Sequence, residues 1–194
     1  MEAFLVASSV LLWAVVGFNL LLTLALVRKA NADGHSQQMG LAPGTPAPGF
    51  TAQTLDGNTV TLADYAGKKV VFLFISPYCD ACKERMPEYQ LLHAKARHSG
   101  VDMVLVNIIG DFDAVREMAT ELKLMLPLLH APQKSNSFAR DYKVMGTPFY
   151  CLVDEKGIVQ SMNYPGLEAG SEWKKLVSAW NATEYLGQLT IDAS

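Results

Sequence analysis

Two nearly continuous apolar runs in the middle of the chain predict the centre of a β-sheet. Residues 70–75 read Val-Val-Phe-Leu-Phe-Ile, and the run over residues 101–109 is broken only by Asp102 and Asn107. A strand that is buried on both faces has no polar side, so such runs are typical of central strands. We therefore predict that both segments are buried strands of one sheet.

Alternating polar and apolar positions predict a hairpin on each side of these strands. Residues 50–62 place β-forming residues around Asp56-Gly57-Asn58, and residues 149–162 do the same around Glu155-Lys156-Gly157. Two short alternating runs that flank a glycine-containing turn favour a β-hairpin. The chain is therefore expected to begin and end its sheet with antiparallel pairs.

Apolar residues at helical spacing predict helices between the strands. Residues 82–97 form such a segment, in which Pro87 is expected to introduce a kink. Shorter segments of the same kind are expected after the central strands, as helices over about 113–123 and 135–141 and after Gly170, with a short strand over 124–129. Strands that alternate with helices in this order predict an α/β domain, a mixed sheet covered by helices.

The first part of the chain has a different pattern, because no charged residue occurs from Ala3 to Val27. Twenty-five helical residues span roughly 37 Å, which exceeds a hydrocarbon core of about 30 Å, so residues 3–27 are predicted to be a transmembrane anchor. A cleaved signal peptide is the alternative, and Ala30-Asn31-Ala32 resembles its cleavage site. We predict a Pro/Gly-rich linker over 28–48, a globular domain over 49–182 and a tail over 183–194.

Composition narrows the classes of function. The 194 residues carry a net charge of -3, which gives no reason to expect nucleic-acid binding. Three cysteines are too few for a disulfide-stapled scaffold, and the four histidines lack the spacing of metal ligands. No glycine-rich phosphate loop is present. We therefore predict neither a metal nor a cofactor.

The segment between the first central strand and the following helix carries the chemistry. It reads Ser76-Pro77-Tyr78-Cys79-Asp80-Ala81-Cys82-Lys83, and a Cys-x-x-Cys that follows a strand and opens a helix is the thioredoxin-type redox arrangement. The helix N-terminus stabilises a thiolate on the first cysteine. We assign Cys79 as the attacking nucleophile and Cys82, one turn further into the helix, as the resolving thiol.

Other interpretations of the two cysteines have less support in the sequence. A zinc site needs a second pair of ligands at suitable spacing, and a structural disulfide across so short a loop confers little entropic stabilisation. The charge of Asp80 beside the predicted thiolate disfavours it, which Lys83 and Arg85 partly oppose. We therefore expect a reducing or intermediate redox potential rather than that of a strong oxidant.

The segment resembles the thioredoxin-fold redoxins of the TlpA/ResA type, and most closely the membrane-anchored MauD family of methylamine-utilisation proteins. The resemblance runs from about Pro43 to Trp180 and includes the cysteine motif, Pro87 and the Thr147-Pro148 turn. It implies a thioredoxin fold with an N-terminal β-hairpin and a central βα insertion, preceded by one transmembrane helix. It also implies a cis Thr147–Pro148 bond opposite the cysteines, with Tyr78, Thr147 and Pro148 contacting the substrate.

The resemblance to this family also implies a single-pass protein of the bacterial inner membrane, with its domain on the periplasmic side. The implied partners are exported proteins that carry disulfides, together with a membrane redox partner. Three features depart from the pattern: Tyr78 stands where a tryptophan is common, and Arg85 stands where ResA-like proteins carry glutamate. Finally, Arg28 and Lys29 would place the domain in the cytoplasm by the positive-inside rule.

We therefore predict a membrane-tethered thiol–disulfide oxidoreductase, a protein-disulfide reductase or isomerase. One alternative is a peroxiredoxin-type thiol peroxidase, but its Pro-x-x-x-Thr/Ser-x-x-Cys pattern fails, because Phe72 stands where the proline is needed, seven residues before Cys79. A second alternative is a copper-handling assembly chaperone that uses both cysteines as Cu(I) ligands. The leftover Cys151 is expected to be a small core residue.

Overall fold

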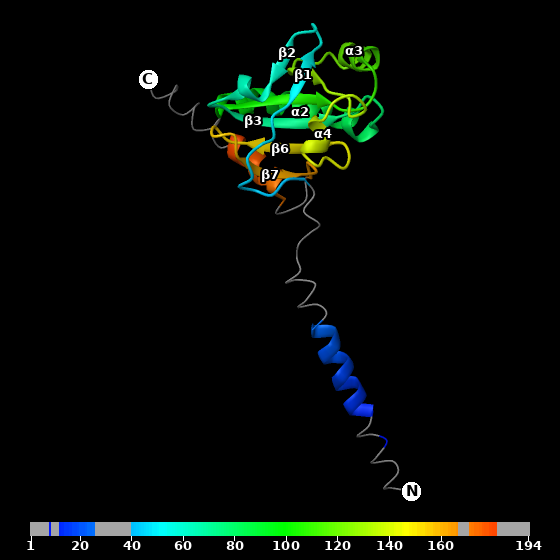
Figure 1. Cartoon of the computed structure of the whole chain (residues 1–194). Coiled ribbons are helices and arrows are strands. Elements are labelled where there is room, and N and C mark those ends of the chain that lie inside the picture. Colours follow the sequence, from blue (N-terminus) through cyan, green and yellow to red (C-terminus); the bar gives the residue numbers. More distant parts are fainter. Residues whose placement is uncertain (1–7, 9–11, 26–39, 167–170, 182–194) are drawn as a thin grey trace. The chain divides into compact units, whose positions relative to one another are not determined.

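The structure is a computed structural model, and it describes residue 8 and residues 12–25, 40–166 and 171–181. The chain divides into two compact units, Met1–Gln38 and Met39–Ser194. In the first unit, residues 12–25 form a helix. In the second, a sheet of seven strands is flanked by helices (Figure 1). The tail predicted over 183–194 lies outside the described residues.

The sheet has the strand order β2-β1-β5-β4-β3-β6-β7. In chain order the strands are β1 (Thr51–Thr54), β2 (Thr59–Thr61), β3 (Lys69–Ile75), β4 (Val101–Asn107), β5 (Leu128–His130), β6 (Phe149–Val153) and β7 (Val159–Asn163). Strand β3 is parallel to β4 and antiparallel to β6, so the predicted mixed sheet is confirmed. Both predicted hairpins are also confirmed, as β1–β2 and β6–β7.

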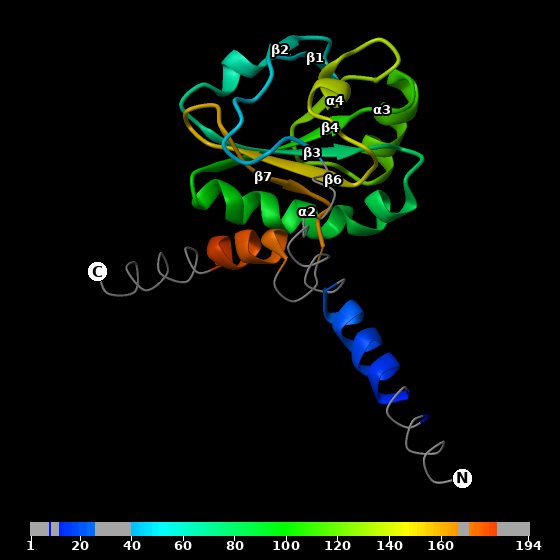
Figure 2. The same cartoon turned by 60° about the horizontal axis from the view of Figure 1, so that its bottom comes forward.

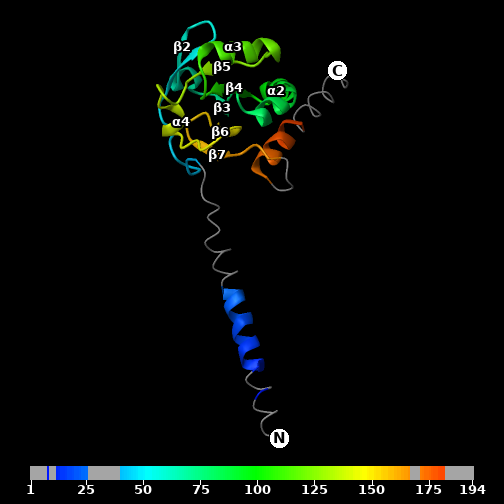
Figure 3. The ribbon, with the colours of Figure 1, turned by 90° about the vertical axis from the view of Figure 1, so that its right-hand side faces the viewer.

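Helices cover both faces of the sheet. They are η1 (Leu62–Tyr65, a 3-10 helix), α2 (Asp80–His98), α3 (Phe112–Glu121) and α4 (Phe138–Asp141), and residues 172–181 are also helical. Helix α2 and the helical residues 172–181 lie on one face, and α4 lies on the other (Figures 2 and 3). Helix α3 and strand β5 are placed between β4 and α4, where the sequence predicts a central insertion.

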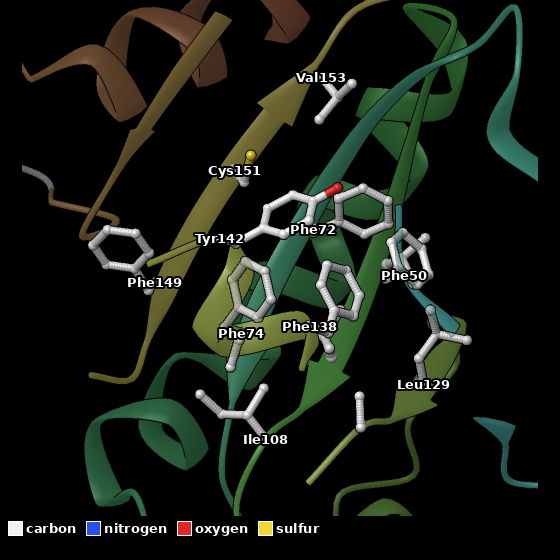
Figure 4. Close-up of a cluster of buried hydrophobic side chains, with 14 of the residues drawn as sticks. Phe50, Phe72, Phe74, Ile108, Leu129, Phe138, Tyr142, Phe149, Cys151 and Val153 are labelled. Atoms are coloured by element: carbon white, nitrogen blue, oxygen red, sulfur yellow. The ribbon is translucent and has the colours of Figure 1, made fainter. Parts of the chain in front are cut away.

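Strand β3 separates two hydrophobic cores because its side chains alternate between the faces of the sheet. Leu73 and Ile75 pack toward α2, in a core that also contains Trp173. Phe72 and Phe74 pack on the opposite side against α4 (Figure 4). The aromatic rings there form a close cluster: Phe50 stacks on Phe138 at 3.8 Å between ring centroids, and Phe72, Phe74 and Tyr142 meet the Phe138 ring edge-on. Burial of β3 on both sides fixes the end of the strand from which the cysteine motif begins.

Two element boundaries differ from those that the sequence predicts. Helix α2 begins at Asp80 rather than Cys82, because Cys79 itself caps the helix. The strand predicted over 124–129 is wrong in its first half, since β5 begins only at Leu128. Pro127 has no backbone N–H to donate to a neighbouring strand. Lys123, the residue before the predicted strand, adopts a left-handed backbone conformation with φ 47°, which ends the preceding turn.

The second half of the predicted linker packs against the domain. Leu41 is buried, although this segment is predicted to contribute nothing to the core. Hydrogen bonds of 2.8–2.9 Å join Gly44 and Thr45 to Val159, and Ala47 to Gly157. Residues 40–48, here called the strap, therefore cover the outer edge of the β6–β7 hairpin, an edge that would otherwise be free to pair with another chain.

The predicted transmembrane span, residues 3–27, lies partly outside the described residues. Its described part is the helix over residues 12–25. Among the residues that the structure describes, none belongs to a helix that combines the length and the apolar character needed to cross a membrane. The anchor therefore stays a prediction.

Candidate functional site

The two cysteines of the motif lie at the junction between the central strand and helix α2. Strand β3 ends at Ile75, a tight turn follows in which the Cys79 N–H donates to the Ser76 carbonyl at 3.2 Å, and α2 begins at Asp80. Cys79 and Cys82 form a disulfide, with their Cα atoms 5.2 Å apart. The predicted pair is therefore joined at the helix N-terminus.

The two sulfur atoms have different surroundings. Cys79 is partly exposed, whereas Cys82 is fully buried beneath it. As the N-cap residue, Cys79 accepts a hydrogen bond from the backbone N–H of Cys82, 3.2 Å from its Sγ. An N–H donor and the positive end of the helix dipole both stabilise negative charge on Cys79 once the disulfide is opened. The outer cysteine is thus placed to attack and the inner one to resolve.

A loop far along the chain completes the site. Residues 145–148, here called the proline loop, immediately precede β6, and β6 pairs with β3 so that Phe149 lies opposite Phe74. This pairing brings the carbonyl oxygen of Thr147 to 3.5 Å from Cys79 Sγ. The Thr147–Pro148 peptide bond is cis, as the resemblance implies. Thr147 and Pro148 therefore lie beside the cysteines, as expected for residues predicted to contact a substrate.

Tyr78, the residue before Cys79, is 67% exposed. Its backbone N–H donates to the Ser76 hydroxyl at 3.1 Å. Its ring lies over Gly110, where an added Cβ would come within 3.1 Å of the ring, and the positive φ of Gly110, 97°, also favours glycine. Tyr78 also borders a pocket of about 480 Å³. The pocket is lined by Tyr78, Ile108, Ile109, Gly110, Asp111, Pro132, Gln133, Lys134 and Ser135.

Further exposed apolar side chains flank the same region, and the sequence did not single them out. They are Ile109 next to Gly110, Met145 in the proline loop and Tyr164 after β7. The Tyr164 hydroxyl would lie 3.0 Å from a Cβ on Gly146. No periodic signal marks these residues, because each one lies in a loop. A surface of this kind suits a polypeptide substrate better than a small polar molecule.

Asp64, Glu84 and Glu88 are carboxylates that could serve in proton transfer, but two of them have other partners. Asp64 accepts hydrogen bonds from the Thr61 backbone N–H and hydroxyl, which lower the pKa of its carboxyl. Glu88 pairs with Arg85, with Arg85 Nε 3.2 Å from Glu88 Oε2, and Glu84 is exposed. Within the described residues, no three or more His, Cys, Asp and Glu side chains are grouped so that they could hold a metal ion.

Two buried groups near the sheet have no evident part in the exchange. Cys151 is fully buried in the core beside Phe72, and burial raises the pKa of its thiol, which agrees with its predicted structural role. Asn107, at the end of β4, is also buried, and its Nδ2 lies 3.1 Å from His130 Nδ1. Burial lowers the pKa of His130, and the Asp111 carboxylate opposes that shift. Cys151 thus lies in the interior of the sheet, whereas Asn107 pairs with Ile75 at the end of β3 that precedes the cysteine motif.

The geometry of the site suits thiol–disulfide exchange. Such exchange needs an accessible thiolate and a second thiol that can displace the mixed disulfide. Cys79 at the helix cap meets the first need, and Cys82 beneath it meets the second. The Thr147 carbonyl and the apolar surface around Tyr78 offer contacts for an incoming chain.

The domain is similar in sequence to a known protein family and to characterised relatives. Residues 43–162 match the AhpC/TSA family. The chain is 32% identical over 130 residues to the thioredoxin-like protein YneN of Bacillus subtilis, covering 66% of this chain and 74% of YneN. It is 29% identical over 164 residues to the thiol-disulfide oxidoreductase ResA of Oceanobacillus iheyensis, covering 82% and 80% of the two chains.

A solved structure agrees with these sequence matches at the level of the fold. The thioredoxin domain of a thiol-disulfide oxidoreductase from Bacteroides vulgatus superimposes with a TM-score of 0.60 at 22% identity. The alignment covers 70% of this chain and 96% of that domain. The predicted thioredoxin-like α/β fold is therefore confirmed.

Proposed function

The chain belongs to the AhpC/TSA family and is a thiol–disulfide oxidoreductase of the ResA type, and from that premise we propose that it reduces or isomerises disulfides in exported proteins while tethered to a membrane. The observation that carries the proposal is the Cys79–Cys82 disulfide at the N-terminus of α2, with Cys79 accessible and Cys82 buried. Protein disulfides are the substrate class that the apolar surface around the pair fits best.

In the reductive direction the dithiol form starts the cycle. The Cys79 thiolate attacks one sulfur of the substrate disulfide, the substrate S–S bond breaks, and the departing thiolate takes up a proton. The Cys82 thiol then loses its proton and attacks Cys79 Sγ, which releases the second substrate thiol. The products are a reduced substrate and the Cys79–Cys82 disulfide, the form seen in the structure. A dithiol partner returns two electrons and two protons to restore the enzyme.

The groups around Cys79 support the reductive direction of net electron flow. Asp80 begins α2 directly after Cys79 and places a negative charge there, while the Thr147 carbonyl turns its negative end toward Cys79 Sγ. Both disfavour a thiolate and oppose the helix N-terminus. A less stabilised thiolate makes the pair a weaker oxidant, so we assign a reducing or intermediate potential.

Membrane tethering is supported by the character of the helix over residues 12–25. Its large apolar side chains are exposed on every face of the helix; Leu12 is 64% exposed, Trp13 75% and Leu24 47%. Its two polar side chains bond to its own backbone: Asn19 Nδ2 donates to the Val15 carbonyl at 3.2 Å, and the Thr23 hydroxyl donates to the Asn19 carbonyl at 2.8 Å. A helix in lipid must satisfy its polar groups internally in this way.

We further propose that the domain faces the extracytoplasmic side of the bacterial inner membrane, where it meets exported substrates and a membrane redox partner. Disulfides form and persist in that compartment, whereas the cytosol keeps thiols reduced. Arg28 and Lys29 oppose this orientation, but two charges are a weak bias. Kinship with the MauD family is proposed on the same basis, from the anchor and the cysteine motif together.

Two experiments test the proposal. The purified full-length protein should reduce insulin disulfides with dithiothreitol as electron donor, and Cys79→Ser should abolish this activity. In cells, a topology reporter fused after Ser194 should report an extracytoplasmic C-terminus, with the Cys79–Cys82 pair oxidised or mixed. A fully reduced pair on the cytoplasmic side would contradict the location, and an insulin-inactive wild type would contradict the activity.

A thiol peroxidase is the alternative within the same fold. Ser76 supplies the hydroxyl side chain of its pattern, but the position that needs a proline is Phe72, which is fully buried in β3. A peroxide-consumption assay separates the two activities. Copper handling by the two cysteines predicts instead that the reduced protein binds Cu(I) with a defined stoichiometry, which titration measures.

A further inference from the structure

We propose that Arg85 is a positioning residue that connects helix α2 to the proline loop through Pro165 and Tyr164. The inference rests on the proposed function, because it concerns how the site holds a protein substrate. Arg85 lies three residues after Cys82, so the two side chains are neighbours on one face of α2. Its contacts run away from the helix toward the segment that follows β7.

The guanidinium of Arg85 is held in one place by its neighbours on α2. Its Nε donates to Glu88 Oε2 at 3.2 Å, and the two side chains are only 21% and 31% exposed. The guanidinium carbon also lies 5.7 Å from the centre of the Tyr89 ring. An ion pair and a cation–π contact together restrict a long side chain that would otherwise be free in solvent.

The third contact of Arg85 leaves the helix. Its Nη1 donates to the backbone carbonyl of Pro165, 80 positions away in the sequence. Pro165 is itself buried. A guanidinium can bond two partners in different directions at once, whereas the single ammonium of lysine at this position could not reproduce both contacts with the same geometry. Arg85 therefore fixes the chain after β7 to the helix that carries the cysteines.

Tyr164 carries the connection on to the proline loop. Its ring meets the Phe149 ring edge-on, with centroids 5.0 Å apart. Its hydroxyl sits over Gly146, where an added Cβ would come within 3.0 Å. Tyr164 thus contacts Gly146 and Phe149, the residues on either side of the Thr147-Pro148 segment that faces Cys79.

The two halves of the site are consequently joined at two places. The first is the contact between Cys79 Sγ and the Thr147 carbonyl, 3.5 Å apart. The second is the path from Arg85 through Pro165 and Tyr164. A substrate that bonds to Cys79 and lies along the proline loop must disturb the first contact, so the path from Arg85 then acts with the pairing of β6 and β3 to hold the loop in register with α2. Its loss should weaken binding of a polypeptide and spare attack on a small disulfide, which needs no loop.

Arg116 on α3 provides a matched control. Like Arg85 it pairs with a carboxylate three residues away, Nη1 to Asp113 Oδ1 at 3.6 Å, and its guanidinium carbon lies 4.9 Å from the centre of the Phe112 ring. It differs in being more than half exposed and in having no such contact with a distant carbonyl among the described residues. A role limited to helix stability would make the two arginines equivalent.

The experiment compares Arg85→Met, Tyr164→Ala and Arg116→Met in the full-length protein, with reduced enzyme, insulin as the protein substrate and dithiobis-nitrobenzoate as the small disulfide. We expect Arg85→Met to raise KM for insulin about fivefold to tenfold with kcat little changed, and to leave the rate with the small disulfide within about twofold. Tyr164→Ala breaks the same path at its other end and should give the same split. Arg85→Lys should recover part of the loss, and Arg116→Met should match the wild type on both substrates.

The outcomes are distinct. An active wild type with an unchanged insulin KM in folded Arg85→Met or Tyr164→Ala would overturn the role of Arg85 and leave the proposed function standing. An equal loss of activity with insulin and with the small disulfide would also overturn it, because the variant would then have changed the reactivity of the cysteines rather than the position of the proline loop. A wild type that reduces no protein disulfide would remove the proposed function, and this inference with it. Thermal unfolding of each variant identifies a folded sample.

Discussion

The carbonyl oxygen of Thr147 lies 3.5 Å from Sγ of Cys79, across 68 positions of sequence. The contact joins the cap of α2 to the loop that leads into β6, two parts of the chain that only the pairing of β3 with β6 brings together. It is made by the main chain of Thr147, not by its side chain. The same main-chain groups are available to an incoming polypeptide.

This relationship predicts that the side chain of Thr147 is dispensable. Thr147→Ala keeps the carbonyl and the following proline, so insulin reduction should stay within about twofold of the wild type. Tyr78→Ala is the contrasting variant, because it removes an exposed aromatic surface beside Cys79 and should raise KM for insulin. Steady-state kinetics measure both, and a tenfold loss in Thr147→Ala would contradict a main-chain role.

A second prediction concerns the aromatic core beneath the proline loop. Phe138 is fully buried and contacts Phe50, Phe72, Phe74 and Tyr142. Phe138→Ala removes these contacts and leaves a cavity, so it should lower the free energy of unfolding by about 3–5 kcal/mol. Urea denaturation measures the change. Arg140→Ala, on the exposed side of the same short helix, should change it by no more than about 0.5 kcal/mol.

The strap over residues 40–48 carries a third prediction. Leu41 is 7% exposed and packs in the core that includes Met162. Leu41→Ala should therefore lower the free energy of unfolding by about 2 kcal/mol, whereas Leu91→Ala, at a site 70% exposed, should have little effect. If both variants unfold at the same urea concentration as the wild type, the strap contributes nothing to the domain.

The fourth prediction is a pH dependence that involves His130. Burial lowers the pKa of this imidazole in the folded state below the ordinary value of 6.5, despite the opposing charge of Asp111. When the pH falls below about 6.5, the unfolded chain therefore binds the proton more readily than the folded one, and stability is lost until the pH reaches the lower folded pKa. The free energy of unfolding should thus fall between pH 7 and the folded pKa of His130.

His130→Asn tests this pH dependence, because it keeps an acceptor for the Asn107 amide without a titrating ring. Urea denaturation at several pH values should show a shallower loss of stability on acidification than in the wild type. The exposed His98 supplies the control, His98→Asn. Equal slopes in the wild type and His130→Asn would contradict the assignment.

Much of the sheet is readable from the sequence because burial dictates it. The run over residues 70–75 has to be central, since no other place in a domain hides both sides of a strand. The hairpins follow from Asp56-Gly57-Asn58 and Glu155-Lys156-Gly157, whose turn chemistry is local. The Cys-x-x-Cys at the start of a helix likewise carries its chemistry in adjacent residues, and the structure joins the two cysteines there.

Features that depend on distant partners could not be predicted in this way. Leu41 looks like part of a linker because its neighbours are prolines and glycines, and its place in the core comes from distant residues such as Met162 on β7. Arg85 is visible as a departure from the ResA pattern, but its bond to the Pro165 carbonyl depends on the tertiary path of the chain after β7. Tyr164 has no sequence signal, since its role comes from lying over Gly146.

The central claim is that Cys79 attacks and Cys82 resolves, and trapping of the mixed disulfide tests it most directly. Reduced full-length Cys82→Ser and Cys79→Ser proteins are incubated with insulin, quenched with acid and analysed by mass spectrometry. We predict that Cys82→Ser accumulates a disulfide between Cys79 and an insulin chain, and that Cys79→Ser accumulates none because Cys82 is fully buried. A mixed disulfide on Cys82 in Cys79→Ser, with none on Cys79 in Cys82→Ser, would contradict the claim.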